Sequence, residues 1–165
     1  MNLDRQNDYS PLGLILTNDW ILLATRLLLG GVFLFASLGK ISAPQAFAAS
    51  IGGFKLLHDT ILLEVSLLIL WHEVICGVLI LIGVWARPAA MVLACMLIMF
   101  FLALASAYAR GLDIDCGCFG ALMASGVGLW AIFRTMLLFI LSVIILLYGS
   151  GSYSLDRLFS RRKPL

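Results

Sequence analysis

Charged residues are scarce in this sequence: Asp, Glu, Lys and Arg make up 12% of its 165 residues, while 62% are hydrophobic. A soluble domain carries about 25% charged residues, because its surface has to be well solvated by water. With half that charge, the chain lacks the polar surface of a water-soluble particle, so its excess apolar surface must face lipid. The mean hydropathy of +1.08 agrees. The composition therefore predicts a membrane protein, and its length predicts one domain.

Histidine is rare as well, and positive charge does not form a broad surface. The chain has two His residues and a net charge of +2, and many of its basic residues gather in the C-terminal tail. A nucleic-acid-binding protein needs a basic face on a soluble fold, so nucleic acid is excluded as a partner. Basic residues beside apolar stretches instead suit the headgroups of a lipid bilayer.

Four apolar stretches are each near the roughly 20 residues that a bilayer core requires. They are Trp20–Ile41, Ile61–Trp85, Pro88–Ala109 and Val127–Gly149. Backbone groups in lipid need hydrogen-bond partners within their own segment, so each stretch must be an α-helix. We predict an all-α membrane protein, a four-transmembrane-helix bundle over residues 20–149, with an N-terminal tail (1–19) and a basic C-terminal tail (150–165).

The segment between the first two stretches has its own helical pattern. Ser42 and Gln45 form a capping-box pattern, and Pro44 suits a first helical turn. Apolar side chains then recur at helical spacing: Phe47, Ile51 and Phe54. We predict a short interfacial helix whose apolar side faces the lipid. An ordinary ordered loop is the alternative.

The distribution of Lys and Arg predicts the orientation. At the ends of the stretches and in the segments between and beyond them, six basic residues fall on the side of the two termini: Arg5, Arg87, Arg157, Arg161, Arg162 and Lys163. Three fall on the other side: Lys40, Lys55 and Arg110. The excess predicts cytoplasmic termini and a periplasmic segment Arg110–Gly126 in a bacterial inner membrane. Because Asp4 and Asp8 replace the positive start of a signal peptide, the first stretch is expected to remain as a signal anchor.

Cys116 and Cys118, separated by Gly117, lie just after the third stretch. Residues two apart can bring their Cα atoms within the roughly 4.4–6.8 Å of a disulfide, and Gly117 adds backbone freedom. A disulfide persists in an oxidising compartment such as the periplasm. Its small ring would be strained, and strained, exposed disulfides are exchangeable. Cys116 and Cys118 are therefore the predicted catalytic pair.

Two other interpretations of this pair stay open. A structural disulfide is one, although so small a loop stabilises little. A metal site formed by the thiolates with Asp113 or Asp115 is the other, but the segment has no further Cys or His. We expect no metal.

Cys76 and Cys95 lie inside the second and third stretches at similar depths. A second redox pair is conceivable there. The alternative is that both are small hydrophobic side chains of the bundle.

Ionisable residues inside a membrane are costly and are candidates for function. They are Arg26 and Lys40 in the first stretch, Glu64, His72 and Glu73 in the second, and Arg134 in the fourth. A cation near Cys116 would lower the pKa of its thiol, and the candidates are Lys40, Arg110 and Arg134. Asp115 would oppose this effect.

His72 and Glu73 lie near the middle of the second stretch, about 100° apart around the helix. Glu73 could accept protons, pair with Arg26, or hydrogen-bond a membrane quinone, with His72 as a further contact. An ion pair that only joins two helices is the simpler alternative.

Several runs of the chain resemble the MauE/DoxX redox-associated membrane proteins. The signature is Arg110–Leu112 leading into Asp115–Gly120, and the weaker helical likenesses are Gly31–Lys40, Glu73–Gly77, Leu79–Gly83 and Arg87. The resemblance covers roughly residues 20–149. It implies a four-helix bundle with a role in extracytoplasmic disulfide formation or electron transfer. MauE proteins are associated with maturing the disulfide-rich small subunit of methylamine dehydrogenase, together with a thioredoxin-like partner.

By position, the resemblance assigns the redox pair to Cys116 and Cys118 and the polar helix positions to Lys40 and Glu73. In the family's fourth helix an Arg is often paired with an acidic or amide residue, whereas here Arg134 is followed by Thr135. The resemblance therefore gives Arg134 no pairing role.

Our first hypothesis is a membrane thiol-disulfide oxidoreductase that exchanges with a periplasmic thioredoxin-fold protein or a disulfide-bonded client. The second is a non-catalytic membrane subunit that anchors or assembles a larger redox complex. A small transporter is the weakest, because no pair of broken helices is evident.

Overall fold

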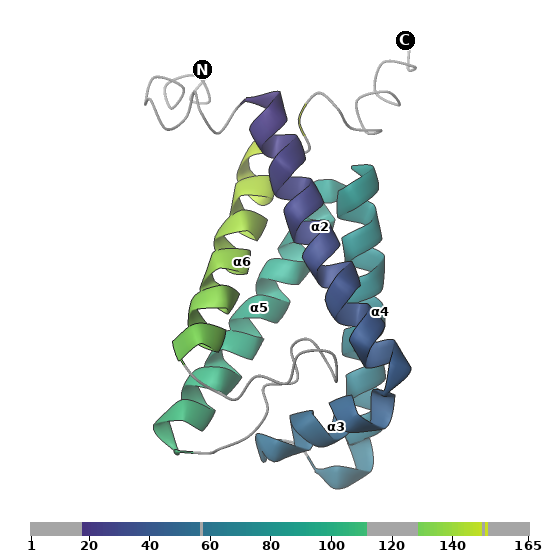
Figure 1. Ribbon diagram of the computed structural model, residues 1–165, viewed down its shortest axis with the longest axis vertical. Helices are drawn as coiled ribbons and strands as arrows, with labels where there is room; N and C mark the ends of the chain where they lie inside the picture. Colours follow the sequence, from purple (N-terminus) through teal and green to yellow (C-terminus); the bar gives the residue numbers. More distant parts are fainter. Residues whose placement is uncertain (1–17, 57, 112–128, 150, 152–165) are drawn as a thin grey trace, which may run out of the picture.

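In the described part of the chain, all regular secondary structure is helical. The structure, a computed structural model, describes residues 18–56, 58–111, 129–149 and 151 (Figure 1). Its elements are α2 (Asp19–Ser42), α3 (Pro44–Gly53), the 3-10 helix η1 (Asp59–Ile61), α4 (Leu62–Ile82), α5 (Ala86–Ala109) and α6 (Leu129–Tyr148). Within these residues α2, α4 with η1, α5 and α6 are long and apolar enough to cross a membrane. The predicted all-α, four-span membrane protein is confirmed.

Local sequence signals explain where the spans begin and end. The Asn18 side chain accepts a hydrogen bond from the Trp20 backbone N–H at 3.1 Å and so caps the start of α2. Gly83 ends α4 with a φ of 76°, a left-handed conformation that glycine adopts without steric penalty. The predicted second stretch continued to Trp85, which instead lies in the turn before α5. This short turn holds α4 and α5 as antiparallel neighbours.

The predicted short helix is confirmed as α3, with two corrections. Ser42 does not cap it, because Ser42 is the last residue of α2 and its hydroxyl donates to the Gly39 carbonyl at 2.9 Å. The prediction that its apolar side faces lipid is wrong: Phe47 and Phe54 are 5% and 4% exposed. Their side chains are buried because the bundle leaves space beneath α3 that large rings can fill.

The bundle has two distinct ends. At one end, here called the turn end, α2 begins, α6 finishes and residues 83–85 join α4 to α5 (Figure 1). At the other, the α3 end, α3 lies across the bundle beside the start of α4, and α5 finishes where α6 begins. The helices pack mainly as two pairs, α2 with α4 and α5 with α6.

The α2–α4 pair is held close by small residues. A Cβ atom on Gly30 would lie 2.6 Å from Leu81 Cγ and 2.9 Å from the Gly77 carbonyl oxygen. Such close approach of two backbones is typical of membrane helices, where dispersion contacts replace the hydrophobic effect as the driving force. Leu29 and Ile80, both fully buried, form the core beside this crossing.

Arg26 closes the turn end. Its guanidinium donates hydrogen bonds to the carbonyls of Ile80 and Leu81, at 2.9 and 3.0 Å, and its side chain is 1% exposed. The last carbonyls of a helix have no partner within that helix, and their partial negative charge favours a cation. A Cβ atom on Gly83 would lie 2.1 Å from this guanidinium, so only glycine fits there. Arg26 therefore caps α4.

Candidate functional site

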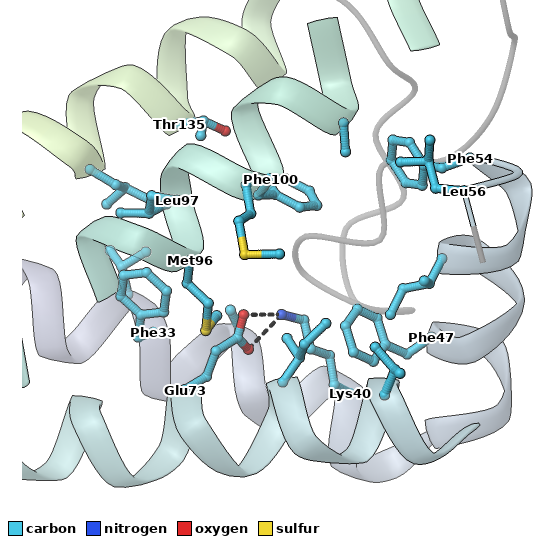
Figure 2. Close-up of a pocket in the computed structure, with 18 residues that line it drawn as sticks. Phe33, Lys40, Phe47, Phe54, Leu56, Glu73, Met96, Leu97, Phe100 and Thr135 are labelled. Carbon is cyan, nitrogen blue, oxygen red and sulfur yellow. Dashed lines mark hydrogen bonds and ion pairs between the residues drawn. The ribbon is translucent and has the colours of Figure 1, made fainter. Parts of the chain in front are cut away.

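A cavity of about 370 Å³ lies at the α3 end, between the two helix pairs (Figure 2). Residues of α2, α3, α4, α5 and α6 contribute to its wall. Its apolar lining includes Phe33, Phe47, Phe54, Met96, Leu97 and Phe100. The cavity exists because the helix pairs diverge toward this end while α3 covers them from one side.

One ion pair lies in this apolar wall. The Lys40 ammonium contacts both Glu73 carboxylate oxygens, at 2.6 and 2.5 Å (Figure 2). The two side chains are 3% and 8% exposed. The partner of Glu73 in the structure is Lys40 rather than Arg26, and the pair joins α2 to α4. Removing two charges from water costs several kcal/mol per ion, so each residue depends on the other.

The local structure favours this position for Lys40. It lies in the last turn of α2, where the helix dipole stabilises positive charge. Its ammonium also lies 4.7 Å from the centroid of the Phe47 ring, on α3. A cation over an aromatic face is attracted by the ring's quadrupole, more strongly where water is excluded. The ion pair therefore connects α2, α3 and α4 at one point.

Arg110 joins two chain segments at the edge of the site. From the C-terminus of α5, its guanidinium donates to the Phe54 carbonyl at 2.5 Å and to the Ser106 carbonyl at 3.3 Å. Phe54 in turn meets Phe100 edge to face, with ring centroids 6.3 Å apart. These contacts tie the end of α3 to the end of α5. Arg110 thus has a positioning role in the described structure.

The predicted catalytic residues Cys116 and Cys118, and Asp115 beside them, lie outside the described residues. The described residues that flank this segment are Gly111, after α5, and Leu129, at the start of α6. Both lie at the α3 end, which is also the end of the cavity and of the Lys40–Glu73 pair.

The other predicted polar residues are dispersed. His72 is exposed and its ring contacts the Leu68 carbonyl at 2.7 Å, whereas the adjacent Glu73 is buried in the cavity wall. The structure therefore places His72 and Glu73 on different faces of α4. Arg134 is partly buried on α6, and the following residue, Thr135, lines the cavity with its hydroxyl bonded to the Ala131 carbonyl.

Cys76 and Cys95 are both free thiols in the structure. Cys76 is buried in the core beside Leu29 and Ile80, while Cys95 is exposed on α5. The structure forms no disulfide between them, and the burial of Cys76 among apolar side chains agrees with its interpretation as a small hydrophobic residue. Within the described residues no cluster of His, Cys, Asp and Glu could hold a metal ion.

Sequence reasoning missed the residues that shape the cavity. The apolar pattern around Phe47 predicts that it faces lipid, and no pattern in the sequence marks Thr135 as a cavity residue. The partner of Lys40 was also missed, because the separation of 33 residues between Lys40 and Glu73 carries no periodic signal. The one available signal was that the two residues carry charges of opposite sign in neighbouring apolar stretches.

Fold and cavity together define a four-span membrane protein with a buried ion pair at one end of its bundle. Residues 18–148 match the model of the family described as methylamine utilisation protein MauE. The chain is 30% identical over 131 residues to the methylamine utilization protein MauE of Paracoccus denitrificans, covering 79% of this chain and 70% of that relative. No solved structure matches the chain. The chain belongs to the MauE family; the DoxX part of the predicted resemblance finds no support in these comparisons.

Proposed function

We propose that this protein is a membrane thiol-disulfide redox protein that uses Cys116 and Cys118, and that it serves methylamine utilisation, as the name of its relative says of that protein. Its partner in exchange is a periplasmic thioredoxin-like protein or a disulfide-bonded client. One observation carries the proposal. The flanks of the cysteine segment, Gly111 and Leu129, lie at the same end of the bundle as the buried Lys40–Glu73 pair.

The proposed orientation places the α3 end in the periplasm and both termini in the cytoplasm of a bacterial inner membrane. The excess of Lys and Arg on the side of the termini supports it. Arg87, exposed at the start of α5, lies against Gly149 at the turn end and adds positive charge there. This orientation exposes Cys116 and Cys118 to an oxidising compartment.

The exchange transfers a disulfide without any other reagent. A thiolate of one protein attacks a sulfur of the other protein's disulfide, forming a mixed disulfide and releasing a thiolate. The second thiol of the attacking protein then attacks the mixed disulfide, which leaves the attacking protein with the disulfide and the other protein as a dithiol. We assign the mixed disulfide to Cys118, because the negative charge of Asp115 disfavours the thiolate of its neighbour Cys116. Glu73 already neutralises the charge of Lys40. Arg110 is therefore a better candidate than Lys40 for the cation that favours a thiolate in the cysteine segment.

The test is a redox titration of the membrane-embedded protein. Thiols are alkylated across a glutathione series, in the parent and in Cys116→Ser, Cys118→Ser and Cys95→Ser. We expect one reversible two-electron transition that either of the first two substitutions removes and that Cys95→Ser leaves intact. Cys116→Ser should also prolong a mixed disulfide with the partner through Cys118.

A different result would favour the second hypothesis, a membrane subunit that anchors or assembles a redox complex. If both Cys116→Ser and Cys118→Ser support normal client oxidation, the proposed exchange is wrong. Normal oxidation combined with loss of a co-purifying partner in these variants would point to an assembly role for the segment.

A further inference from the structure

We propose that the cavity at the α3 end binds the head group of a lipid-soluble quinone, with the Lys40–Glu73 pair as its polar contact. This inference rests on the proposed function, because it names the acceptor for the electrons of the thiol pair. Binding of the quinone does not depend on Cys116 or Cys118, whereas its reduction does.

The cavity is accessible from the membrane. Met99, near the middle of α5, lines the cavity and is also 72% exposed, so the cavity reaches the lipid-facing surface of the bundle there. Val65 and Ile69 on α4 form the facing wall. A ligand entering between α4 and α5 comes from the hydrocarbon layer, so it has to be lipid-soluble.

The charge of the site restricts the ligand further. Lys40 and Glu73 together are neutral, and no other charged side chain lines the cavity in the described part of the chain. A phosphate or a carboxylate head group would add an unpaired charge to an apolar enclosure, at a cost of several kcal/mol. The head group therefore has to be uncharged and able to accept a hydrogen bond. A quinone carbonyl has both properties.

The shape and the chemistry of the lining agree with a flat ring. Aromatic rings from Phe47, Phe54 and Phe100 line the cavity, and the Phe47 ring is the one next to Lys40 (Figure 2). A Lys ammonium has three N–H donors, and among the described residues its hydrogen-bond acceptors are the two Glu73 oxygens, which leaves one donor for a ligand. A volume of about 370 Å³ lies in the range of small-ligand sites.

A quinone accounts for all the electrons and protons that the thiol pair releases. A dithiol that becomes a disulfide loses two electrons and two protons. A quinone takes up both electrons and both protons, one proton on each carbonyl oxygen, and becomes a quinol. No further oxidant or reductant is needed for this step.

The test measures binding of decylubiquinone to the full chain in lipid nanodiscs. Two substitutions on α5 form a matched pair. Ala103→Trp fills the cavity that Ala103 lines, whereas Leu102→Trp adds the same bulk at a neighbouring position that is 60% exposed. We expect Ala103→Trp to abolish binding and Leu102→Trp to leave it unchanged. Equal affinity in the two variants would overturn the site.

A second variant tests recognition of the head group. Lys40→Met combined with Glu73→Met removes both charges together, which leaves no unpaired ion and is tolerated in comparable buried pairs. We expect its affinity for decylubiquinone to fall by about tenfold, because a hydrogen bond to a charged group is lost. Unchanged affinity would mean that the cavity accepts an acyl chain only, and the inference would be wrong.

The two proposals fail in different ways. The double variant Cys116→Ser, Cys118→Ser should bind decylubiquinone as the parent does. Quinone binding without a reducible cysteine pair would overturn the proposed function and leave the quinone site standing. A reducible pair without quinone binding would overturn the quinone site alone.

Discussion

The two ends of the bundle bury a cation in different ways. At the turn end, Arg26 donates to backbone carbonyls of α4 inside a dense core. At the α3 end, Lys40 pairs with a side-chain carboxylate at the wall of a cavity. Backbone carbonyls cannot gain or lose a proton, so Arg26 serves the fold. A carboxylate can change its protonation, and space beside it can admit a ligand, so the proposed chemistry is assigned to the α3 end.

The largest effect is expected from breaking the ion pair at one partner. Glu73→Met leaves the Lys40 ammonium buried and unpaired, which should destabilise the protein by about 3–5 kcal/mol. The double variant with Lys40→Met should regain most of this loss, because no charge is then left buried. Unfolding in a detergent series measures both. If the double variant were no more stable than Glu73→Met, the two residues would not depend on each other.

The second-largest loss of stability is expected from a substitution at the turn end. Arg26→Met removes the donor to the Ile80 and Leu81 carbonyls, at a cost of about 2–3 kcal/mol. Because Arg26 serves the fold, the redox potential of the cysteine pair should not change in protein that remains folded. Detergent unfolding and the glutathione series provide the two measurements. A shifted potential in folded Arg26→Met would contradict the division between the two ends.

The helix crossing offers a comparison between adjacent glycines. Gly30→Ala places a Cβ atom 2.6 Å from Leu81 Cγ, so α2 and α4 must separate; we expect a loss of about 1–3 kcal/mol. Gly31 has open space at the same position, and Gly31→Ala should instead stabilise the helix by about 0.5–1 kcal/mol. The same unfolding assay distinguishes them. Equal effects of the two substitutions would show that the crossing is looser than described.

The smallest effect should come from the ring above Lys40. Phe47→Leu keeps an apolar side chain on α3 but removes the cation–π contact, worth about 0.5–2 kcal/mol. In the variant that lacks Lys40 and Glu73, the same substitution should cost less, because there is no cation for the ring to attract. A double-mutant cycle on detergent unfolding measures the difference. An equal cost in both backgrounds would assign Phe47 to packing alone.

Much of the fold was predictable because a bilayer limits the options. Any stretch long and apolar enough to cross it must be helical, so the four spans and the short helix after Ser42 could be placed from the sequence. Local signals set several ends, such as Asn18 before α2 and Pro44 at the start of α3. The direction in which α3 turns its apolar side was not predictable. Lipid and a protein cavity are both apolar, and the residue pattern does not distinguish them.

For the candidate site, too, some features could be predicted from the sequence and others only from the tertiary structure. The sequence by itself determined which residues are candidates for chemistry: the Cys116–Cys118 pair by its spacing, and Lys40 and Glu73 by their charge inside apolar stretches. Only the tertiary structure decided that Glu73 pairs with Lys40 rather than Arg26, that His72 turns away, and that Cys76 and Cys95 stay apart. The physical reason is that charge and hydropathy are properties of single residues, whereas a partner depends on how two helices rotate and cross. That rotation is set by packing at positions such as Gly30 on α2 and Gly77 on α4, where the two backbones approach each other closely.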